Sequence, residues 1–428
     1  MHLEQMIDYI HRLPRMEGTP TLARMQQALE KLDHPDRDFH IIHVAGTNGK
    51  GSTCAILASI LTAAGYRTGL FTSPFLDAFT NRVKVDGADI SATDLGVSFE
   101  RLMPVAEEVG LTQFEFITAL GLLHFARAGV DAVVLEVGLG GRFDATNAIS
   151  TPLLSVITNI GYDHMAILGD TLAKIAGEKA GIIRTGVPVI TAVEEPSAWS
   201  VIRERCLELE APVSRLGDQF SVTGLYSDLQ GQVLRYESGH QHLDSVKIAL
   251  LGRHQQKNAA TALAAAFQLR SLGLLISDQA MRTGLAEARW PGRFEVMSEI
   301  PLVIMDGSHN THGMAALRET LDELLPSQNL LWVAGMMADK DVGGMLKYLE
   351  GREVSLYACA PQIPRAMDAK ELALAAITLG FQARAFAGVE EAISQALLDW
   401  RPGQAVLIAG SLYVISEARR HPFFSVKS

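Results

Sequence analysis

The feature that most constrains this chain is a regular alternation of short β-branched runs with longer helical stretches between residues 40 and 190. A strand-then-helix order of this kind favours a mostly parallel sheet that is covered by helices on both faces. The runs that we expect to form strands are residues 41–46, 66–73, 131–138, 153–160 and 188–191, and the expected helices cover 52–65, 114–129 and 171–183.

A second alternation begins after the segment WPGRFEV at 290–296. Its strand-like runs are residues 302–307, 330–336, 354–360, 383–388 and 405–411. Because 428 residues are too many for one ordinary core, we expect two domains, 1–290 and 291–428, with a hinge at Pro291 and Gly292. Between the alternations, residues 213–248 show the polar alternation and turn residues of antiparallel strands, and 254–273 is predicted to be helical.

Charge and cysteine content argue against several classes of protein. The chain has 37 Lys and Arg against 48 Asp and Glu, a net charge of -11, and no basic run dense enough to follow a nucleic-acid backbone. Three cysteines that lie far apart, Cys54, Cys206 and Cys359, favour a reducing compartment over a disulfide scaffold. The N-terminus lacks the apolar core of a signal peptide, and no apolar stretch reaches membrane-spanning length. We therefore expect a cytoplasmic protein without nucleic-acid or membrane partners.

A glycine-rich segment, HVAGTNGKGST at 43–53, lies between the first strand-like run and the first expected helix. Its three glycines allow backbone amides to face an anion at the helix N-terminus, and Lys50 can place a charge on the outer phosphates of a nucleotide. The residue after Lys50 is Gly51, so the segment is a variant of the usual phosphate loop, with its hydroxyls at Ser52 and Thr53. By itself this loop predicts nucleotide binding and does not separate a kinase, a GTPase and a ligase.

Further motifs occur in a fixed order along nearly the whole chain. They are TSPFL (72–76), LEVGLGGRFDATN (135–147), ITNIGYDH (157–164), IAGEKAGI (175–182), HQQKNAA (254–260), WPGRFEV (290–296), DGSHN (306–310), ADKD (338–341) and GSLYVISEAR (410–419). On these motifs the sequence closely resembles the folylpolyglutamate synthase and dihydrofolate synthase family, within the Mur ligase superfamily. The resemblance implies an α/β fold, with a mostly parallel P-loop domain like the Mur ligase central domain and a smaller, Rossmann-like C-terminal domain.

The family's reaction, as the resemblance implies, forms an amide between a pteridine-linked carboxylate and the amine of L-glutamate. ATP activates the carboxylate as an acyl phosphate, which the amine attacks. The implied substrates are L-glutamate, dihydropteroate and reduced folates, and the implied cofactors are ATP and two Mg²⁺ ions, with a monovalent cation as a further candidate. We expect a bifunctional dihydrofolate and folylpolyglutamate synthase that is a monomer, and a synthase with one of the two activities is the nearest alternative.

The resemblance also assigns site residues. The implied nucleotide contacts are Asn48, Gly49, Lys50, Gly51, Ser52, Thr53, Asn258 at adenine, Arg293 at the phosphates, Asp306 at the ribose, and His309, with ATP bound between the domains. The implied metal ligands are Ser73, Glu136, His164 and a carbamylated Lys179, and Lys50, His164 and Lys179 are the implied catalytic residues. The positions that match the family's pteridine site are Thr112, Gln113, Phe114, Glu115, Phe143, Asp144 and Ala145.

One of these assignments has independent support in the residues. Glu136 comes at the C-terminal end of an apolar run, the edge of a parallel sheet where ligands bind, and a carboxylate there suits Mg²⁺. Carbamylation of Lys179 rests on the resemblance: a free lysine has a pKa of about 10.4, so the reaction needs partial desolvation that favours the neutral amine.

Three departures from the family's pattern concern pteridine handling more than ATP chemistry. Phe75 stands where many relatives have His, Asn81 stands for a carboxylate, and residues 16–25 lack the family's Gly-Leu pattern.

Two other classes are open to test. A Mur-type ligase acting on a nucleotide-sugar peptide usually carries an additional N-terminal domain, and here only about 40 residues precede the loop. A guanine-selective switch would show an Asn/Thr-Lys-x-Asp motif on a later strand of the first domain, and we find none there.

Overall fold

The computed structural model describes residues 2–15 and 21–425, so part of the atypical segment 16–25 lies outside the described residues. The chain divides into two compact units. The first comprises residues 1–225, 233–249 and 255–289, and the second comprises 226–232, 250–254 and 290–428.

The first unit is built on an eight-stranded sheet in the order β4-β3-β2-β5-β1-β6-β7-β8. The strands are β1 (His40–Ala45), β2 (Thr68–Phe71), β3 (Val83–Val85), β4 (Ala88–Asp89), β5 (Ala132–Glu136), β6 (Leu154–Ile157), β7 (Val189–Thr191) and β8 (Val213–Arg215). The strands from β2 across to β8 pair in parallel. At the other edge, β3 pairs antiparallel with both β2 and β4. In the central strands, Val44 is level with Glu136 on one side and Val156 on the other.

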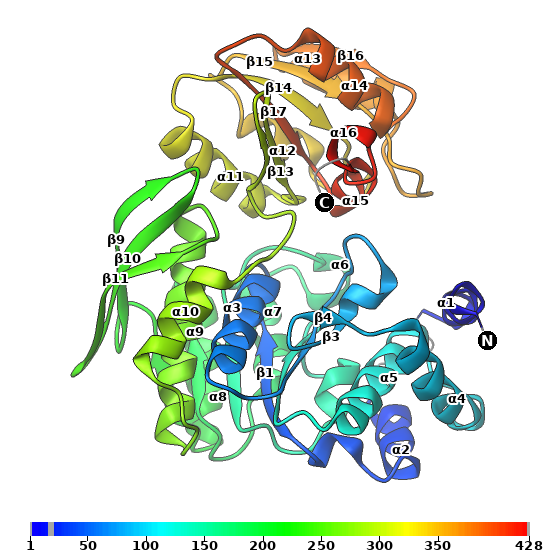
Figure 1. Ribbon diagram of the computed structural model, residues 1–428, viewed down its shortest axis with the longest axis vertical. Helices are drawn as coiled ribbons and strands as arrows, with labels where there is room; N and C mark the ends of the chain where they lie inside the picture. The colour runs from blue at the N-terminus through cyan, green and yellow to red at the C-terminus, as the bar shows by residue number, and fades with distance from the viewer. Residues whose placement is uncertain (1, 16–20, 426–428) are drawn as a thin grey trace. The chain divides into compact units, whose positions relative to one another are not determined.

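The central strands of this sheet are apolar and almost wholly buried, as in other parallel sheets that helices cover on both faces. One apolar cluster joins α1, α2, α4 and α5, which lie together in Figure 1, and a separate cluster lies under α7 and α8. The helices are α1 (Leu3–Arg12), α2 (Ala23–Lys31), η1 (Pro35–Arg37), α3 (Lys50–Ala63), η2 (Phe79–Arg82), α4 (Ala92–Val109), α5 (Gln113–Ala128), η3 (Ala145–Ala148), α6 (Met165–Leu168), α7 (Leu172–Lys179), η4 (Ala180–Ile182), α8 (Pro196–Glu208), α9 (Arg253–Ser271) and α10 (Asp278–Glu287).

The segment after α8 differs in part from the antiparallel region expected at 213–248. Residues 213–215 form β8, which pairs parallel with β7 because α8 is the crossover between them. The rest forms a three-stranded sheet of β9 (Ser221–Asp228), β10 (Gly231–Ser238) and β11 (Gln241–Ile248). These strands follow one another with connections of two residues, which only antiparallel neighbours can have.

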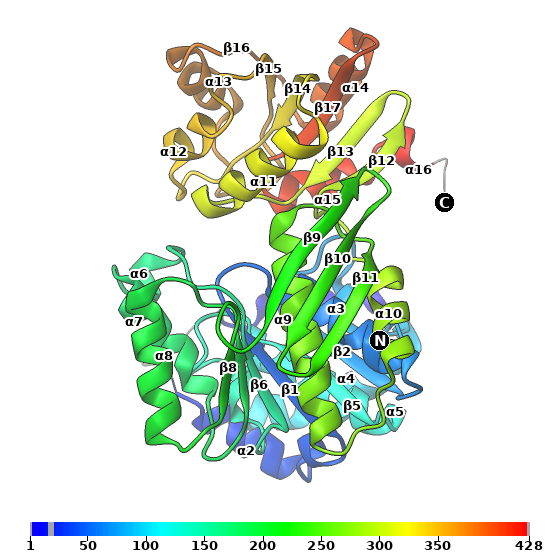
Figure 2. The ribbon, with the colours of Figure 1, turned by 90° about the vertical axis from the view of Figure 1, so that its left-hand side faces the viewer.

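The second unit contains a six-stranded sheet in the order β12-β13-β17-β14-β15-β16 (Figure 2). Its strands are β12 (Glu295–Glu299), β13 (Leu302–Asp306), β14 (Asn329–Ala334), β15 (Val354–Ala358), β16 (Gln382–Ala385) and β17 (Gln404–Ala409). Its helices are α11 (Thr311–Leu324), α12 (Val342–Lys347), α13 (Ala369–Thr378), α14 (Val389–Asp399), α15 (Leu412–Ala418) and α16 (Pro422–Ser425). All strand pairs are parallel except β12 with β13, and the core is packed around the fully buried Trp332.

These two sheets confirm the predicted fold class: a mostly parallel P-loop unit and a second, Rossmann-like α/β unit. No helix among residues 2–15 and 21–425 combines the length and the apolar character that a membrane span requires.

Candidate active site

The phosphate loop connects β1 to α3 at the carboxyl edge of the first sheet. Gly46 has φ +151° and Gly49 has φ +83°, backbone conformations that residues with a side chain rarely adopt. A Cβ at Gly46 would also overlap the hydroxyl of Thr158. The loop conformation therefore requires glycine at both positions.

The loop is held in place by residues 158–161, which follow β6. The amide of Thr47 donates to the carbonyl oxygen of Asn159, and the amide of Asn48 donates to its Oδ1, both at 2.8 Å. The Thr158 hydroxyl donates to the carbonyl oxygen of Asn48, and the Thr47 hydroxyl exchanges hydrogen bonds with both backbone groups of Gly161. Since these contacts occupy the amides of Thr47 and Asn48, the donors that can face an anion begin at Gly49.

The first turn of α3 supplies those donors. Amides of a first helical turn have no acceptor within the helix, so Lys50, Gly51 and Ser52 can donate to a phosphate. The Ser52 hydroxyl accepts a hydrogen bond from Gln255 Nε2 at 3.2 Å. Thr53 is fully buried and its hydroxyl has no hydrogen-bond partner, so its side chain does not reach the surface of the loop.

Two lysines converge on one carbonyl of the loop. Lys50 Nζ donates to the carbonyl oxygens of Gly46 and Thr47, both at 3.1 Å, and Lys179 Nζ donates to that of Gly46 at 2.8 Å. Lys179 comes from the end of α7, 133 residues after Gly46 in the sequence. The fold thus brings two of the predicted catalytic residues to the same point.

Lys179 is electrostatically unusual. It is 4% exposed, and burial together with the nearby charge of Lys50 lowers its pKa from 10.5 to about 7. Asp163 and Asp144 oppose this shift by favouring the charged form. A substantial fraction of the amine is therefore uncharged at neutral pH, which is the form that can react with carbon dioxide.

Two of the predicted metal ligands lie together. The amide of Ser73 donates to Glu136 Oε2 at 3.0 Å, and Glu136 ends β5 beside β1 and is 3% exposed. His164 is an exposed residue with φ +50° at the start of α6, and its Nε2 lies 3.9 Å from Asp163 Oδ1. Within the described ranges, no group of three or more His, Cys, Asp or Glu side chains is arranged to hold a metal ion.

Asn258, the predicted adenine contact, lies against the phosphate loop. A Cβ at Gly49 would overlap Asn258 Oδ1, and Asn258 Nδ2 donates to Gln255 Oε1 at 2.9 Å. Both side chains come from the first turns of α9. The helix therefore places the predicted adenine contact beside the loop that is expected to hold the phosphates.

The predicted pteridine positions at 143–145 are not equivalent. Phe143 is 48% exposed, whereas Asp144 and Ala145 are buried. Asp144 accepts hydrogen bonds from the amides of Leu139 and Thr146 and from the Thr146 hydroxyl, so its carboxylate faces the chain itself. Of the three side chains, only Phe143 presents much of its surface to a ligand.

The other predicted pteridine positions begin α5. Thr112 and Glu115 form a buried capping box, in which Glu115 Oε2 accepts from the amide and hydroxyl of Thr112 and from Arg24 Nε. The amide of Gln113 donates to the carbonyl oxygen of Pro14. Phe114 is half-buried, and its ring lies where a Cβ at Gly138 would be.

The departures at 75 and 81 have clear structural roles. The guanidinium of Arg82 lies 5.1 Å from the ring centre of Phe75, a cation–π contact. Asn81 Oδ1 accepts from the amides of Asp77 and Ala78, and its Nδ2 donates to Asp89 Oδ2. An aspartate or glutamate at 81 could not make the last of these bonds.

In the second unit, Asp306 ends β13 and is 4% exposed. It accepts hydrogen bonds from the amides of Phe294 and Ser308 and from the Ser308 hydroxyl. Arg293 donates to the carbonyl oxygen of Gly292, and His309 Nδ1 lies 2.8 Å from that of Gly307. Together with the bond from the Gly307 amide to the carbonyl oxygen of Gly292, these contacts place Arg293, Asp306 and His309 on two adjacent segments, 292–294 and 306–309.

Sequence patterns missed the residues that support the loop. Thr158, Asn159 and Gly161 belong to a motif in which only His164 was given a role. The run of small polar residues directly after a central strand is the signal that could have indicated them, because that strand end is level with the phosphate loop.

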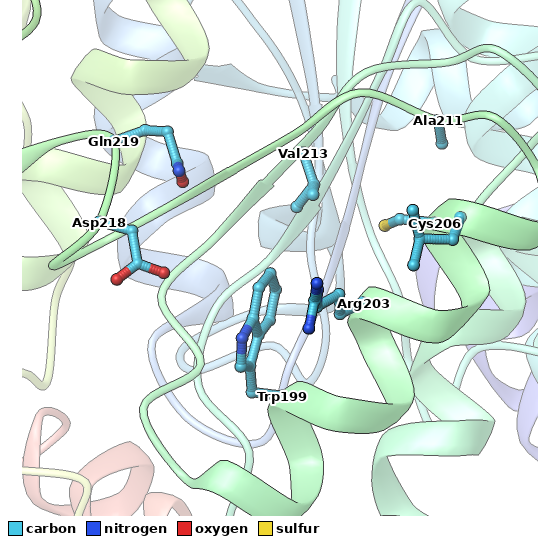
Figure 3. A pocket seen from close by; sticks show the side chains of 8 residues that line it. Trp199, Arg203, Cys206, Ala211, Val213, Asp218 and Gln219 are labelled. Atoms are coloured by element: carbon cyan, nitrogen blue, oxygen red, sulfur yellow. The ribbon is translucent and has the colours of Figure 1, made fainter.

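A cavity of about 340 Å³ lies elsewhere in the first unit, between α8 and β8 (Figure 3). No predicted site residue lines it. Its lining residues are Trp199, Arg203, Cys206, Leu207, Ala211, Val213, Asp218 and Gln219.

Comparison with known protein families identifies both units. Residues 44–266 match the Mur ligase middle domain, and residues 292–412 match the Mur ligase glutamate ligase domain. Together with the phosphate loop, these matches define the chain as an ATP-dependent ligase of the Mur class.

Individual relatives narrow the class further. The chain is 38% identical to the Bacillus subtilis (strain 168) dihydrofolate synthase/folylpolyglutamate synthase, over 96% of this chain and 97% of the relative. It resembles the structure of E. coli FolC in complex with DHPP and ADP, with TM-score 0.91, 34% identity, and coverage of 100% and 99% of the two chains. It also resembles the structure of Mycobacterium tuberculosis folylpolyglutamate synthase complexed with ADP, with TM-score 0.91, 32% identity, and coverage of 97% of each chain. The chain belongs to the dihydrofolate synthase and folylpolyglutamate synthase family, which confirms the resemblance seen in its motifs.

Proposed function

We propose that this chain joins L-glutamate both to dihydropteroate and to reduced folates, with cleavage of ATP to ADP and phosphate. The observation that carries the proposal is the convergence of Lys50 and Lys179 on the carbonyl of Gly46, in the phosphate loop that follows β1, where Val44 is level with the buried carboxylate Glu136. The relatives' names and the ADP and DHPP in their structures support this choice of nucleotide and acceptor. The proposal includes action as a monomer in the cytoplasm.

The nucleotide phosphates would be held by the loop. Amides from Gly49 to Ser52 would surround the phosphates, and Lys50 would leave its two carbonyl partners to contact the outer phosphate. Asn258 would contact adenine. Arg293, Asp306 and His309 would serve the phosphates and ribose, as the family motifs imply. The exposed ring of Phe143 would stack on the pteridine.

Magnesium fits the residues present. Glu136 offers a buried carboxylate oxygen, and Ser73, whose amide donates to that carboxylate, carries a hydroxyl; oxygen donors of this kind suit Mg²⁺. His164 would complete the set, and a carbamate on Lys179 would add oxygen ligands for a second ion. Bound there, the metal would neutralise charge between the ATP phosphates and the acceptor carboxylate. A monovalent cation stays a prediction.

Carbamylation of Lys179 is part of the proposal. The neutral amine attacks carbon dioxide and releases one proton, which leaves an anionic carbamate. The pKa of about 7 makes this reaction accessible at neutral pH. The hydrogen bond to Gly46 holds the amine beside the loop before reaction.

The test measures ADP release and incorporation of isotope-labelled glutamate with dihydropteroate, with tetrahydrofolate and with a panel of other amino acids. We expect one ADP for each glutamate incorporated with either pteridine, and neither product without one. Activity with a single pteridine would limit the chain to one synthase activity. Nucleotide hydrolysis without glutamate incorporation would instead indicate a switch protein and would refute the proposal.

A further inference from the structure

A buried chain of hydrogen bonds runs from β1 into the loop at 138–147. His43 is fully buried in β1, and its Nε2 lies 2.8 Å from the Thr146 hydroxyl oxygen. That hydroxyl lies 2.6 Å from Asp144 Oδ1. The carboxylate of Asp144 also accepts from the amide of Leu139 at 2.8 Å, which closes the loop on itself.

The hydrogen-bond partners indicate a direction for each bond in this chain. Asp144 accepts from backbone amides on both oxygens, and these bonds favour the carboxylate form, although burial raises the pKa of Asp144. The Thr146 hydroxyl must then donate its proton to Asp144 and accept from His43. His43 is therefore neutral and protonated on Nε2, in agreement with a pKa that burial lowers to about 3. Its Nδ1 is buried without a hydrogen-bond partner, so the ring is hydrogen-bonded through Nε2, to Thr146.

The loop that these residues close is also fastened at its centre. The amide of Arg142 donates to the carbonyl oxygen of Glu178, and Asn147 Nδ2 donates to the carbonyl oxygens of Arg142 and Gly181. These bonds attach the loop to the end of α7, where Lys179 lies. Phe143 lies between the two sets of contacts and is the exposed residue that the loop presents.

We propose that His43 and Thr146 are positioning residues for the pteridine substrate. Neither residue contacts the ligand. Together they hold Asp144 against the amide of Leu139, so that the loop keeps Phe143 in the orientation that stacks on the pteridine. Phe143 makes the stacking contact that this inference concerns. This inference rests on the proposed function, because it assumes that Phe143 faces the pteridine.

The first test compares Thr146→Val with Thr146→Ser. Valine keeps the shape of threonine without the hydroxyl, and serine keeps the hydroxyl. We expect Thr146→Val to raise KM for dihydropteroate about tenfold with KM for ATP changed by less than about twofold, since only the pteridine loop is disturbed. Thr146→Ser should lie within about threefold of the wild-type protein for both substrates. An equal rise in both KM values, or no rise for dihydropteroate, would overturn the inference.

A second pair of variants decides the matter if Thr146→Val does not fold. His43→Gln can offer an amide donor near the position of Nε2, and His43→Leu cannot. We expect the same selective rise in KM for His43→Leu and a smaller one for His43→Gln. Equal values in the two variants would overturn the inference.

Hydrogen exchange separates this inference from the proposed function. Without substrate, the amide of Leu139 should exchange at least about tenfold faster in Thr146→Val than in Thr146→Ser, because its acceptor is released. Unchanged exchange would refute the positioning role whatever the enzyme does. Faster exchange in a protein that incorporates no glutamate would refute the proposed function alone.

Discussion

Replacing Lys179 by methionine should remove a pH dependence of the free energy of unfolding, so the variant should be more stable than wild type at low pH and less stable at high pH. The folded-state pKa of about 7 lies below the unfolded value of 10.5, so the unfolded chain binds a proton that the folded chain lacks between these pH values. Stability therefore rises with pH across this window, and the full penalty for burying the charged amine is present below pH 7. At about 1.4 kcal/mol for each pH unit, the difference between 10.5 and about 7 corresponds to about 5 kcal/mol.

Methionine removes this penalty and also removes the hydrogen bond to Gly46, worth about 1 kcal/mol. The variant should be more stable than wild type by about 4 kcal/mol at pH 6, and less stable by about 1 kcal/mol above pH 10.5. Urea denaturation in carbon dioxide-free buffer at several pH values measures both differences. Lys174→Met is the matched control, because Lys174 lies on the same helix with an exposed ion pair to Asp170. The same pH slope in wild type and in Lys179→Met would refute the reasoning.

Three further changes test the loop and the second unit. Gly46→Ala should abolish ATP-dependent activity and lower the free energy of unfolding by about 1 to 3 kcal/mol, because Gly46 has a positive φ and a Cβ there would overlap Thr158. The control Gly177→Ala lies on a helix with open space around it and should be neutral or slightly stabilising in thermal unfolding. Asn159→Asp keeps an acceptor for the amide of Asn48 but adds a negative charge, so KM for ATP should rise about tenfold. Asn159→Ala removes that acceptor and should lower the stability of the protein. Asp306→Ala leaves three donors without their acceptor and should destabilise the second unit by about 3 kcal/mol in urea; a loss below about 1 kcal/mol would contradict this account.

Much of the fold follows from local sequence patterns. The central strand β1 and the second unit's β13, β14 and β17 are short apolar runs that are buried along almost their whole length, and each was predicted. The helices α1, α2, α4 and α8 fall outside the predicted elements. Their boundaries depend on packing against other elements, as in the cluster that α1, α2 and α4 form with α5.

The site was less predictable than the fold. Glycine spacing and the position of Lys50 indicated the phosphate loop, because both act locally. The supporting contacts from Thr158 and Asn159 come from more than 100 residues away, so the sequence of the phosphate loop itself does not indicate them. Asp144 stays a predicted pteridine contact, and its hydrogen bonds from the chain's own amides are a further feature that the motif did not indicate.

The central claim is that the phosphate loop transfers the terminal phosphoryl group of ATP to a carboxylate before glutamate attacks. Dihydropteroate labelled with ¹⁸O in its carboxyl group tests this directly, with inorganic phosphate examined by mass spectrometry after one turnover. An acyl phosphate intermediate predicts one ¹⁸O atom in each phosphate released. If the amide forms from labelled dihydropteroate but the released phosphate carries no ¹⁸O, the account is contradicted.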